Sequence, residues 1–314
     1  MERALIRKDE SRLEWQSKAV LLIVAPWTAV SVLLQGNWWF TQVPVVAWTA
    51  LGISGVFGLV VWRLRAGTAG AAATGAVISA SLMLATVRYP YESSWLHGGL
   101  LPLLTVFLLA FAATKIGATK KEQIGTAESK RGRNAAQVAA NLGVAALAGS
   151  SALVLGWMGI EISPMIVALA VITALAEAAA DTVSSEIGQV FGGQPRMLTT
   201  LRRVDPGTDG AVTLAGTAAG VVAASIVSAI GGWALGVGWS VCVLCIAGAV
   251  LGLFFDSLLG ATLERKGWLN NDAVNFLSTL SAPVFALLVL LAYSYAHSRH
   301  ASGPVGVWLY SLSW

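Results

Sequence analysis

Long uncharged stretches, separated by short polar segments, follow one another along most of the chain. A helix needs roughly 20 mainly apolar residues to cross the hydrocarbon core of a bilayer, and these stretches are long enough to supply them. The pattern predicts an all-α, polytopic bundle with about nine transmembrane helices. The expected helices fall in the following ranges: two in 19–62, one each in 66–87, 98–114, 134–160 and 162–180, two in 210–255, and one in 273–298.

Two stretches are long enough for two crossings, and each contains turn residues near its middle. Glycine, proline and asparagine interrupt regular helices, so we expect a hairpin at each interruption. The first interruption consists of Gln35, Gly36, Asn37 and Pro44, and the second consists of Gly231, Gly232, Gly236 and Gly238.

Composition and charge support a membrane protein and set its orientation. Of the 314 residues, 56% are hydrophobic and 11% are charged, whereas roughly 25% are charged in soluble domains. If the N-terminus is cytoplasmic, eighteen of the twenty Lys and Arg residues fall on the cytoplasmic side, as the positive-inside rule requires. Only Arg88 and Arg299 then fall outside. The net charge of +4 therefore reflects topology, and we expect no nucleic-acid binding, since the charges lie in short loops.

The chain divides into four segments by polarity. Residues 1–18 mix charged and apolar positions, which predicts a short interfacial helix on the cytoplasmic side. Residues 19–114 hold four apolar helices, and residues 115–298 hold helices five to nine, with polar side chains at their cytoplasmic boundaries. Residues 299–314 form a tail outside. We therefore expect a multi-pass protein of the cell membrane whose chemistry lies in the second half of the chain. The sequence is compatible with a homo-oligomer and does not determine the oligomeric state.

A basic segment precedes the helix expected from residue 134. Amide side chains then follow at spacings of three and four, which puts them on one helix face just inside the membrane boundary. A helix N-terminus presents free N–H groups and the positive end of the helix dipole, so this segment favours an anion such as phosphate. Alternatively, the charges only follow the positive-inside rule and the amides form interhelical hydrogen bonds. The residues concerned are Lys130, Arg131, Arg133, Asn134, Gln137 and Asn141.

Carboxylates occur inside two of the expected helices. Glu177 and Asp181 share a face near the cytoplasmic end of the sixth helix, and Asp256 lies at the corresponding end of the eighth, two turns before Glu264. An Asp in the middle of a bilayer costs on the order of 2.5–3.5 kcal/mol, so such groups usually face a polar cavity or a partner. Carboxylates of this kind hold Mg²⁺ against substrate phosphates. A structural ion pair with a loop arginine and a proton or cation pathway are open alternatives.

The cytoplasmic loop of residues 195–212 combines arginines with glycines and aspartates. Glycines allow close backbone approach, which phosphate sites use. However, no GxxxxGK[ST] motif occurs, and a Pro-Gly turn capped by Asp is also an ordinary way to enter a helix. The candidates in this loop are Arg202, Arg203, Gly207, Asp209 and Gly210, and Asn275 adds an amide one turn inside the last helix.

Five segments of the second half, in this order, resemble the phytyl-phosphate kinase family of polytopic membrane proteins. They are RGRNAAQVAANLG from Arg131, ADTVSSEIG from Ala180, PGTDGAVTLAG from Pro206, DSLLGAT from Asp256 and NNDAVNFLS from Asn270. The sequence departs from the family where Leu142 takes the place of a glycine after Asn141, and where Glu264 takes the place of a glutamine.

The resemblance implies an enzyme that transfers a phosphoryl group from CTP to an isoprenyl monophosphate and forms the diphosphate, with Mg²⁺ as cofactor. Its partners would be membrane lipid, the isoprenyl monophosphate and a nucleoside triphosphate. The catalytic residues would be Asp181, Asp256 and Arg203. The metal ligands would be Glu177, Asp181, Glu186 and Asp256. The other ligand-binding residues would be Lys130, Arg131, Arg133, Asn134, Gln137, Asn141, Arg202, Gly207, Asp209, Gly210 and Asn275.

Two other activities fit the same residues. A nucleotidyltransferase that makes a CDP-activated lipid would use the same metal site, but it would release pyrophosphate where the kinase releases CDP. A transporter would bind a proton or a cation at Glu177, Asp181 and Asp256, and it would move charge without any nucleotide.

Overall fold

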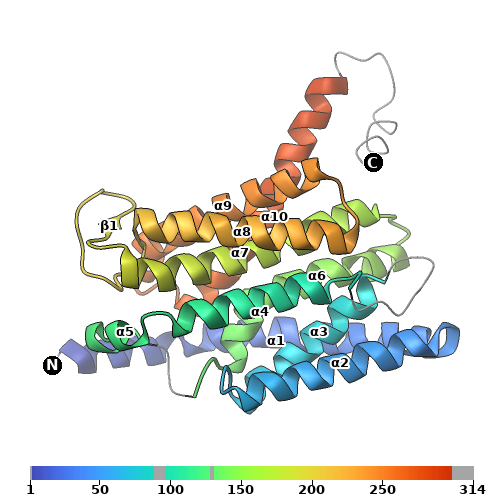
Figure 1. The fold of residues 1–314 in the computed structure, drawn as a ribbon, viewed down its shortest axis with the longest axis horizontal. Coiled ribbons are helices and arrows are strands. Elements are labelled where there is room, and N and C mark those ends of the chain that lie inside the picture. The colour runs from blue at the N-terminus through green and yellow to red at the C-terminus, as the bar shows by residue number, and fades with distance from the viewer. Residues whose placement is uncertain (1, 88–95, 128–130, 299–314) are drawn as a thin grey trace.

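The chain forms a bundle of long helices that run side by side (Figure 1). The structure, a computed structural model, describes residues 2–87, 96–127 and 131–298, with side chains from residue 13 to residue 296. Arg88, Lys130, Arg299 and the tail 299–314 therefore lie outside the described residues. In chain order the elements are α1 (Glu2–Gln42), α2 (Pro44–Arg63), α3 (Ala69–Ala85), α4 (Leu100–Lys115), α5 (Ala118–Ile124), α6 (Ala135–Trp157), α7 (Pro164–Phe191), β1 (Arg196–Met197), β2 (Ala211–Val212), α8 (Leu214–Leu235), α9 (Trp239–Leu259), the π-helix η1 (Gly260–Glu264) and α10 (Asn271–Ser298).

The helices confirm the all-α, polytopic class. Each of the nine expected apolar stretches contains a helix, namely α1 to α4 and α6 to α10. Within the described residues, seven helices are long and apolar enough to cross a membrane. An eighth crossing results if α4 and α5, which meet at a bend of 63°, count as one span. The remaining apolar helix, α3, has only 17 residues.

The first helix differs from the expectation at both ends. Residues 2–18 are not a separate helix, because α1 continues without a break from Glu2 to Gln42. The expected turn at residues 35–37 is also absent, and the chain breaks only at Val43. Gln35 lies inside the helix, where its Nε2 donates to Ser31 Oγ at 2.6 Å, one turn back. Pro44 then starts α2, where its missing N–H is tolerated.

Helix α7 lies at the centre of the bundle, and 83% of its apolar membrane-spanning segment is buried within the protein. Small residues let its neighbours approach closely. A Cβ at Gly220 of α8 would lie 2.9 Å from the carbonyl oxygen of Ala180. A Cβ at Gly252 of α9 would lie 2.7 Å from Glu177 Cγ. The glycines at these crossings therefore make room for α7 and for the carboxylate that it carries.

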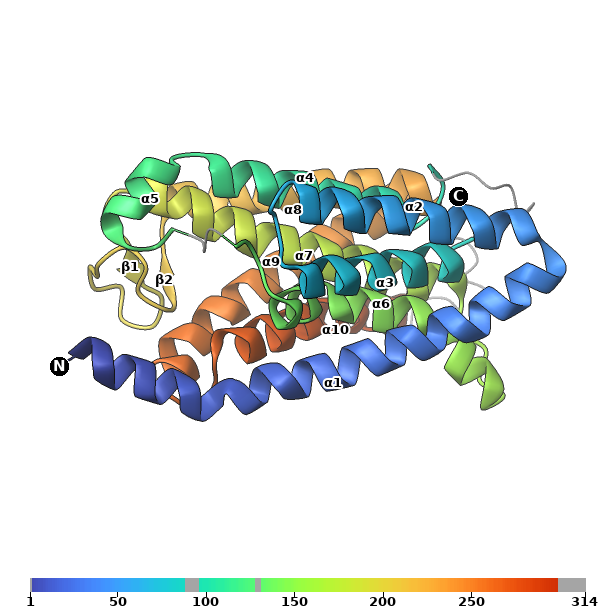
Figure 2. The ribbon, with the colours of Figure 1, turned by 90° about the horizontal axis from the view of Figure 1, so that it is seen from below.

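The polar segments gather at one end of the bundle. Both views place the N-terminal end of α1, the short helix α5 and the β1–β2 hairpin at this end (Figures 1 and 2). The start of α10 joins them, because Gln16 Oε1 of α1 accepts from the Asn270 backbone N–H at 2.8 Å. We call this end, formed by the start of α1, α5, residues 196–212, η1 and the start of α10, the polar end.

Candidate functional site

A carboxylate is completely buried in α7. Glu177 has no exposed surface, and its Oε2 accepts a hydrogen bond from Thr279 Oγ1 of α10 at 2.6 Å. Its other oxygen, Oε1, has no hydrogen-bond partner among the described residues. The sequence expected Glu177 in the last turns of its helix, but α7 continues to Phe191, so Glu177 lies at the middle of the helix. The sequence also did not identify Thr279. The only signal for Thr279 is that it lies one turn after Asn275 on the last helix.

Asp181 and Asp256 meet between α7 and α9. Their carboxyl groups interact electrostatically, although they belong to helices far apart in the sequence. Asp256 Oδ1 is buried and has no hydrogen-bond partner among the described residues. Asp256 also interacts electrostatically with Glu177. The structure therefore brings together three of the four carboxylates that the sequence assigned to a metal.

The π-helix η1 adds a further carboxylate. Glu264, at its end, interacts electrostatically with Asp181 and Asp209. A π-turn shifts the side chains that follow it around the helix, and such turns are frequent at functional sites. Glu264, which the sequence placed two turns after Asp256 and also noted as a departure from the family pattern, therefore belongs to the rim of the carboxylate cluster of Glu177, Asp181 and Asp256.

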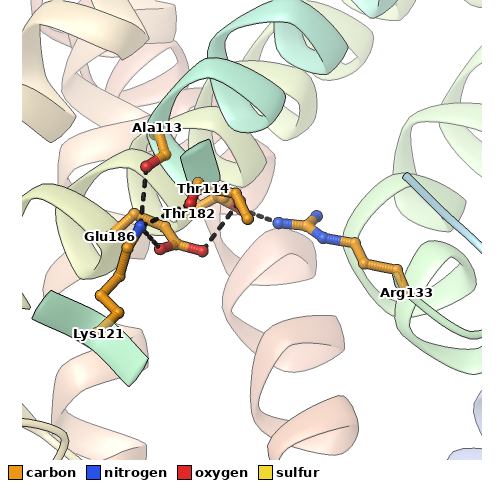
Figure 3. A network of polar contacts seen from close by, with 6 residues as sticks. All are labelled: Ala113, Thr114, Lys121, Arg133, Thr182 and Glu186. Atoms are coloured by element: carbon orange, nitrogen blue, oxygen red, sulfur yellow. Dashed lines mark hydrogen bonds and ion pairs between the residues drawn. The ribbon is translucent and has the colours of Figure 1, made fainter. Parts of the chain in front are cut away.

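Glu186 does not join this cluster. It follows Asp181 by five residues, which turns it by about 140° around α7. Its Oε2 accepts from Lys121 Nζ at 2.6 Å and its Oε1 from Thr114 Oγ1 at 2.9 Å. Lys121 Nζ also donates to the carbonyl oxygens of Ala113 and Thr114 at 3.0 and 2.8 Å (Figure 3). Glu186 thus fixes the bend between α4 and α5.

The carboxylate cluster provides oxygen ligands of the type that Mg²⁺ prefers. Among the described residues, no group of three or more His, Cys, Asp or Glu side chains has the geometry to hold a metal ion by itself. Mg²⁺ usually takes only one or two carboxylates and completes its shell with waters and substrate phosphates. Asp181 and Asp256, with one unpartnered buried oxygen on Asp256, fit that arrangement.

The start of α6 uses its amides to cap the helix. Asn134 Oδ1 accepts from the Gln137 backbone N–H at 3.0 Å, and Gln137 Oε1 accepts from the Asn134 backbone N–H at 2.8 Å. This reciprocal pair is a capping box. Asn141 Nδ2 donates to the Gln137 carbonyl oxygen at 2.8 Å. The amides expected to orient ligands are therefore engaged within their own helix.

The β1–β2 loop packs against η1. Gly210 has φ +72°, and a Cβ there would overlap the backbone of Ala261. Gly210 is therefore required by the fold, since an L side chain fits neither the dihedral angle nor the space. The pKa of Asp209 is raised above its ordinary value because the surrounding protein desolvates its carboxyl, and the Arg265 guanidinium opposes that rise.

The predicted cationic residues occupy different positions at the polar end. Arg131, Arg202 and Arg203 are exposed, whereas Arg133 is half-buried. Gly207, with φ +84°, brings the loop against Thr126 near α5. The exposed arginines can thus reach a ligand at the polar end, while Arg133 lies deeper.

A cavity of about 450 Å³ opens beside this site. Its walls come from both halves of the chain, on α2, α3, α4, α5, α6 and α7. The apolar part of the lining is aromatic and aliphatic and includes Phe57, Gly75, Val106, Phe107 and Phe111. The polar part, which we call the mouth, consists of Arg65, Thr114, Lys115, Lys121, Glu122, Arg133 and Asn141.

Arg133 connects the cavity with the carboxylates. It lines the cavity, its Nη2 donates to Thr182 Oγ1 of α7 at 3.4 Å, and its charge acts on Asp181. Figure 3 shows it extending toward α7 from the side opposite Lys121. An anion held by Arg133 would therefore lie between an apolar chamber and the Asp181–Asp256 pair.

Comparison with known proteins gives relatives among membrane proteins. The chain is 43% identical over 38% of its length to an uncharacterized membrane protein of Methanocaldococcus jannaschii, and the match covers 49% of that protein. It is 30% identical to Protein VTE6, chloroplastic, of Arabidopsis thaliana over 68% of its own length and 63% of the relative. It is also 32% identical over 60% of its length to an uncharacterized membrane protein of Synechocystis, of which 72% is covered.

The chain thus spans less than two thirds of the length of the first two relatives. No solved structure matches it. The family model described as integral membrane protein DUF92 matches residues 52–283, which include the cavity and the carboxylate cluster. The chain therefore belongs to the DUF92 family of integral membrane proteins, in agreement with the resemblance of its polar segments to the phytyl-phosphate kinases.

Proposed function

We propose that this protein transfers a phosphoryl group from CTP to an isoprenyl monophosphate and releases the isoprenyl diphosphate at the cytoplasmic face of the cell membrane. The observation that carries the proposal is that Arg133 belongs both to the mouth of an apolar cavity and to the surroundings of Asp181. The homology to VTE6 and the family resemblance support the same reaction class.

The acceptor would bind with its tail in the cavity and its phosphate at the mouth. The apolar lining offers the tail a site protected from water, and burial of apolar surface is favourable by roughly 25 cal/mol per Å². Arg133 offers the phosphate a charged donor, and such hydrogen bonds are stronger than neutral ones. One anionic head and one apolar tail thus match the two ends of the cavity.

The donor would bind on the side of the carboxylate cluster. Asp181 and Asp256 would hold Mg²⁺, which neutralises charge on the nucleotide phosphates when bound. Arg202 and Arg203, on the exposed β1–β2 loop, would bind the outer phosphates of the nucleotide. Arg133 would then face the acceptor phosphate and hold it in line with the transferred group.

The reaction needs little proton transfer. A phosphate monoester has a second pKa of about 6, so the attacking oxygen is already anionic near neutral pH. That oxygen bonds to the γ-phosphorus of CTP while the bond from the γ-phosphorus to the bridging oxygen breaks, and CDP leaves with the electron pair. The protein contributes positioning and charge neutralisation, which are the main components of catalysis in phosphoryl transfer.

The test is a product analysis with purified protein in detergent. Phytyl or farnesyl monophosphate is incubated with Mg²⁺ and, separately, with CTP, ATP, GTP or UTP, and the products are identified by mass spectrometry. We expect isoprenyl diphosphate and CDP, and we expect both to disappear with Asp181→Asn. Pyrophosphate with a CDP-lipid would instead indicate nucleotidyl transfer. Folded protein that gives no product with any nucleotide would refute the proposal.

A further inference from the structure

The residues that line the cavity change from charged to apolar along α4. Lys115 and Thr114 line it at the C-terminal end of α4, Phe111 follows, and Phe107 and Val106 are the lining residues of α4 farthest from Lys115. The rise of 1.5 Å per residue puts Val106 about 13 Å from Lys115 along the helix axis. A ligand tail that enters at the mouth therefore passes from charged to purely apolar surroundings over a fixed depth.

Aromatic rings close the deep end. The rings of Phe57 on α2 and Phe107 on α4 meet edge to face, with centroids 5.4 Å apart, and Phe107 stacks on Phe111 at 5.9 Å. Phe57 is only 7% exposed and belongs to the core of the bundle. Rings packed against each other and against the core resist displacement, so they form a firm end wall.

Gly75 of α3 lies beside this wall. It is buried and lines the cavity, and a Cβ there would lie 3.7 Å from Phe57 Cε1, at an ordinary contact distance. An alanine would therefore fit without rearrangement. A longer side chain would occupy the space at the deep end, so Gly75 leaves open the last part of the cavity.

The charges at the mouth indicate what enters. Arg65, Lys115 and Arg133 outnumber the single carboxylate of Glu122. Lys121 Nζ is paired with Glu186 and donates to two carbonyl oxygens, and Arg133 Nη2 donates to Thr182 Oγ1, so the excess of positive charge at the mouth includes groups that also have partners within the protein. An amphiphile with an anionic head and an aliphatic tail complements this distribution.

We propose that the deep end of the cavity, formed by Phe57, Gly75 and Phe107, determines the length of the isoprenyl chain that the protein accepts. The inference rests on the proposed function for the identity of the head group, an isoprenyl monophosphate. Chains that end before the aromatic wall fit, and chains that reach past it must bend or leave the cavity.

Direct binding of geranyl and phytyl monophosphate, without nucleotide, tests the inference. Gly75→Leu should lower the affinity for phytyl monophosphate relative to geranyl monophosphate by about tenfold or more, since one methylene in an apolar pocket is worth that much. Gly75→Ala should give a smaller shift in the same direction. Phe107→Ala should act in the opposite direction and raise the affinity for phytyl monophosphate relative to geranyl monophosphate.

Matched controls carry the same changes on outward faces of the same helices. Ala73→Leu adds the same side chain to an exposed position of α3, and Leu108→Ala removes a side chain that is 62% exposed on α4. Neither residue lines the cavity, so both should keep the wild-type ratio of affinities. Unfolding temperatures establish that each variant is folded, and Phe107→Ala still tests the inference if Gly75→Leu does not fold.

The outcomes separate this inference from the proposed function. Opposite shifts in Gly75→Leu and Phe107→Ala support it, and they do so even if no nucleotide yields a diphosphate, in which case only the proposed function fails. An unchanged affinity ratio in folded Gly75→Leu and Phe107→Ala overturns it, as do equal shifts in the Ala73 and Leu108 controls. No binding of any isoprenyl monophosphate to wild-type protein overturns both.

Discussion

Glu186 gives the sharpest prediction, because the sequence assigned it to a metal and the structure pairs it with Lys121. The Lys121 side chain is 2% exposed and its Nζ lies 2.6 Å from Glu186 Oε2. Removal of one partner of a buried ion pair leaves a charge without compensation and costs about 3–5 kcal/mol. Lys121→Met should therefore destabilise the protein by several kcal/mol, and Glu186→Gln should destabilise it somewhat less, because the amide keeps the shape of the carboxylate.

Thermal unfolding in detergent, followed by tryptophan fluorescence, measures this effect. A loss of 1 kcal/mol lowers the unfolding temperature by roughly 2–4 °C in a protein of moderate size, so Lys121→Met should lower it by about 6 °C or more. The double variant Lys121→Met/Glu186→Gln should recover part of the loss, since replacing both partners removes the uncompensated charge.

An exposed ion pair serves as the control. Lys18 and Glu14 lie 3.9 Å apart with side chains 74% and 66% exposed, and such pairs contribute about 0–1 kcal/mol. Lys18→Met should hardly change the unfolding temperature. If Glu186→Gln kept full stability but lost Mg²⁺-dependent turnover, Glu186 would be a metal ligand and would have no structural role in pairing with Lys121.

Three further predictions follow from the site. Asp181→Asn should abolish turnover while the unfolding temperature stays equal or rises, because the change relieves repulsion within the carboxylate cluster; a wild-type rate would contradict its assignment. Arg133→Ala should raise KM for the isoprenyl monophosphate by about 10- to 100-fold, the value of a hydrogen bond to a charged group, whereas an unchanged KM would remove Arg133 from the acceptor site. Gly210→Ala should release the β1–β2 loop and speed its cleavage by protease, because the added Cβ would overlap Ala261. Gly193→Ala should have a smaller effect, because Gly193 has a similar φ of +65° but open space around it. Equal cleavage rates in the two variants would show that only the dihedral angle matters.

The amino-acid pattern was sufficient to predict the helices and to predict that polar residues gather at one end of the bundle. Apolar stretches of membrane-spanning length depend on local composition, so they can be read without knowledge of the neighbours. Glu177 and Asp181, four residues apart, had to share a face of one helix for the same reason. The break between α1 and α2 was misplaced, because tertiary contacts of α1, such as the hydrogen bond from Trp39 Nε1 to the Leu84 carbonyl oxygen, override the weak helix propensity of Gly36 and Asn37.

Tertiary structure decided which polar side chains meet. Helical periodicity gives the face of a residue, but the facing helix depends on close packing at glycines such as Gly220 and Gly252. That packing places Asp181 next to Asp256, whereas the bend between α4 and α5 brings Lys121 to Glu186. The cavity is also a tertiary feature, because six helices from both halves of the chain form its walls. Contacts between distant segments depend on the summed shape of many side chains, which no local pattern contains.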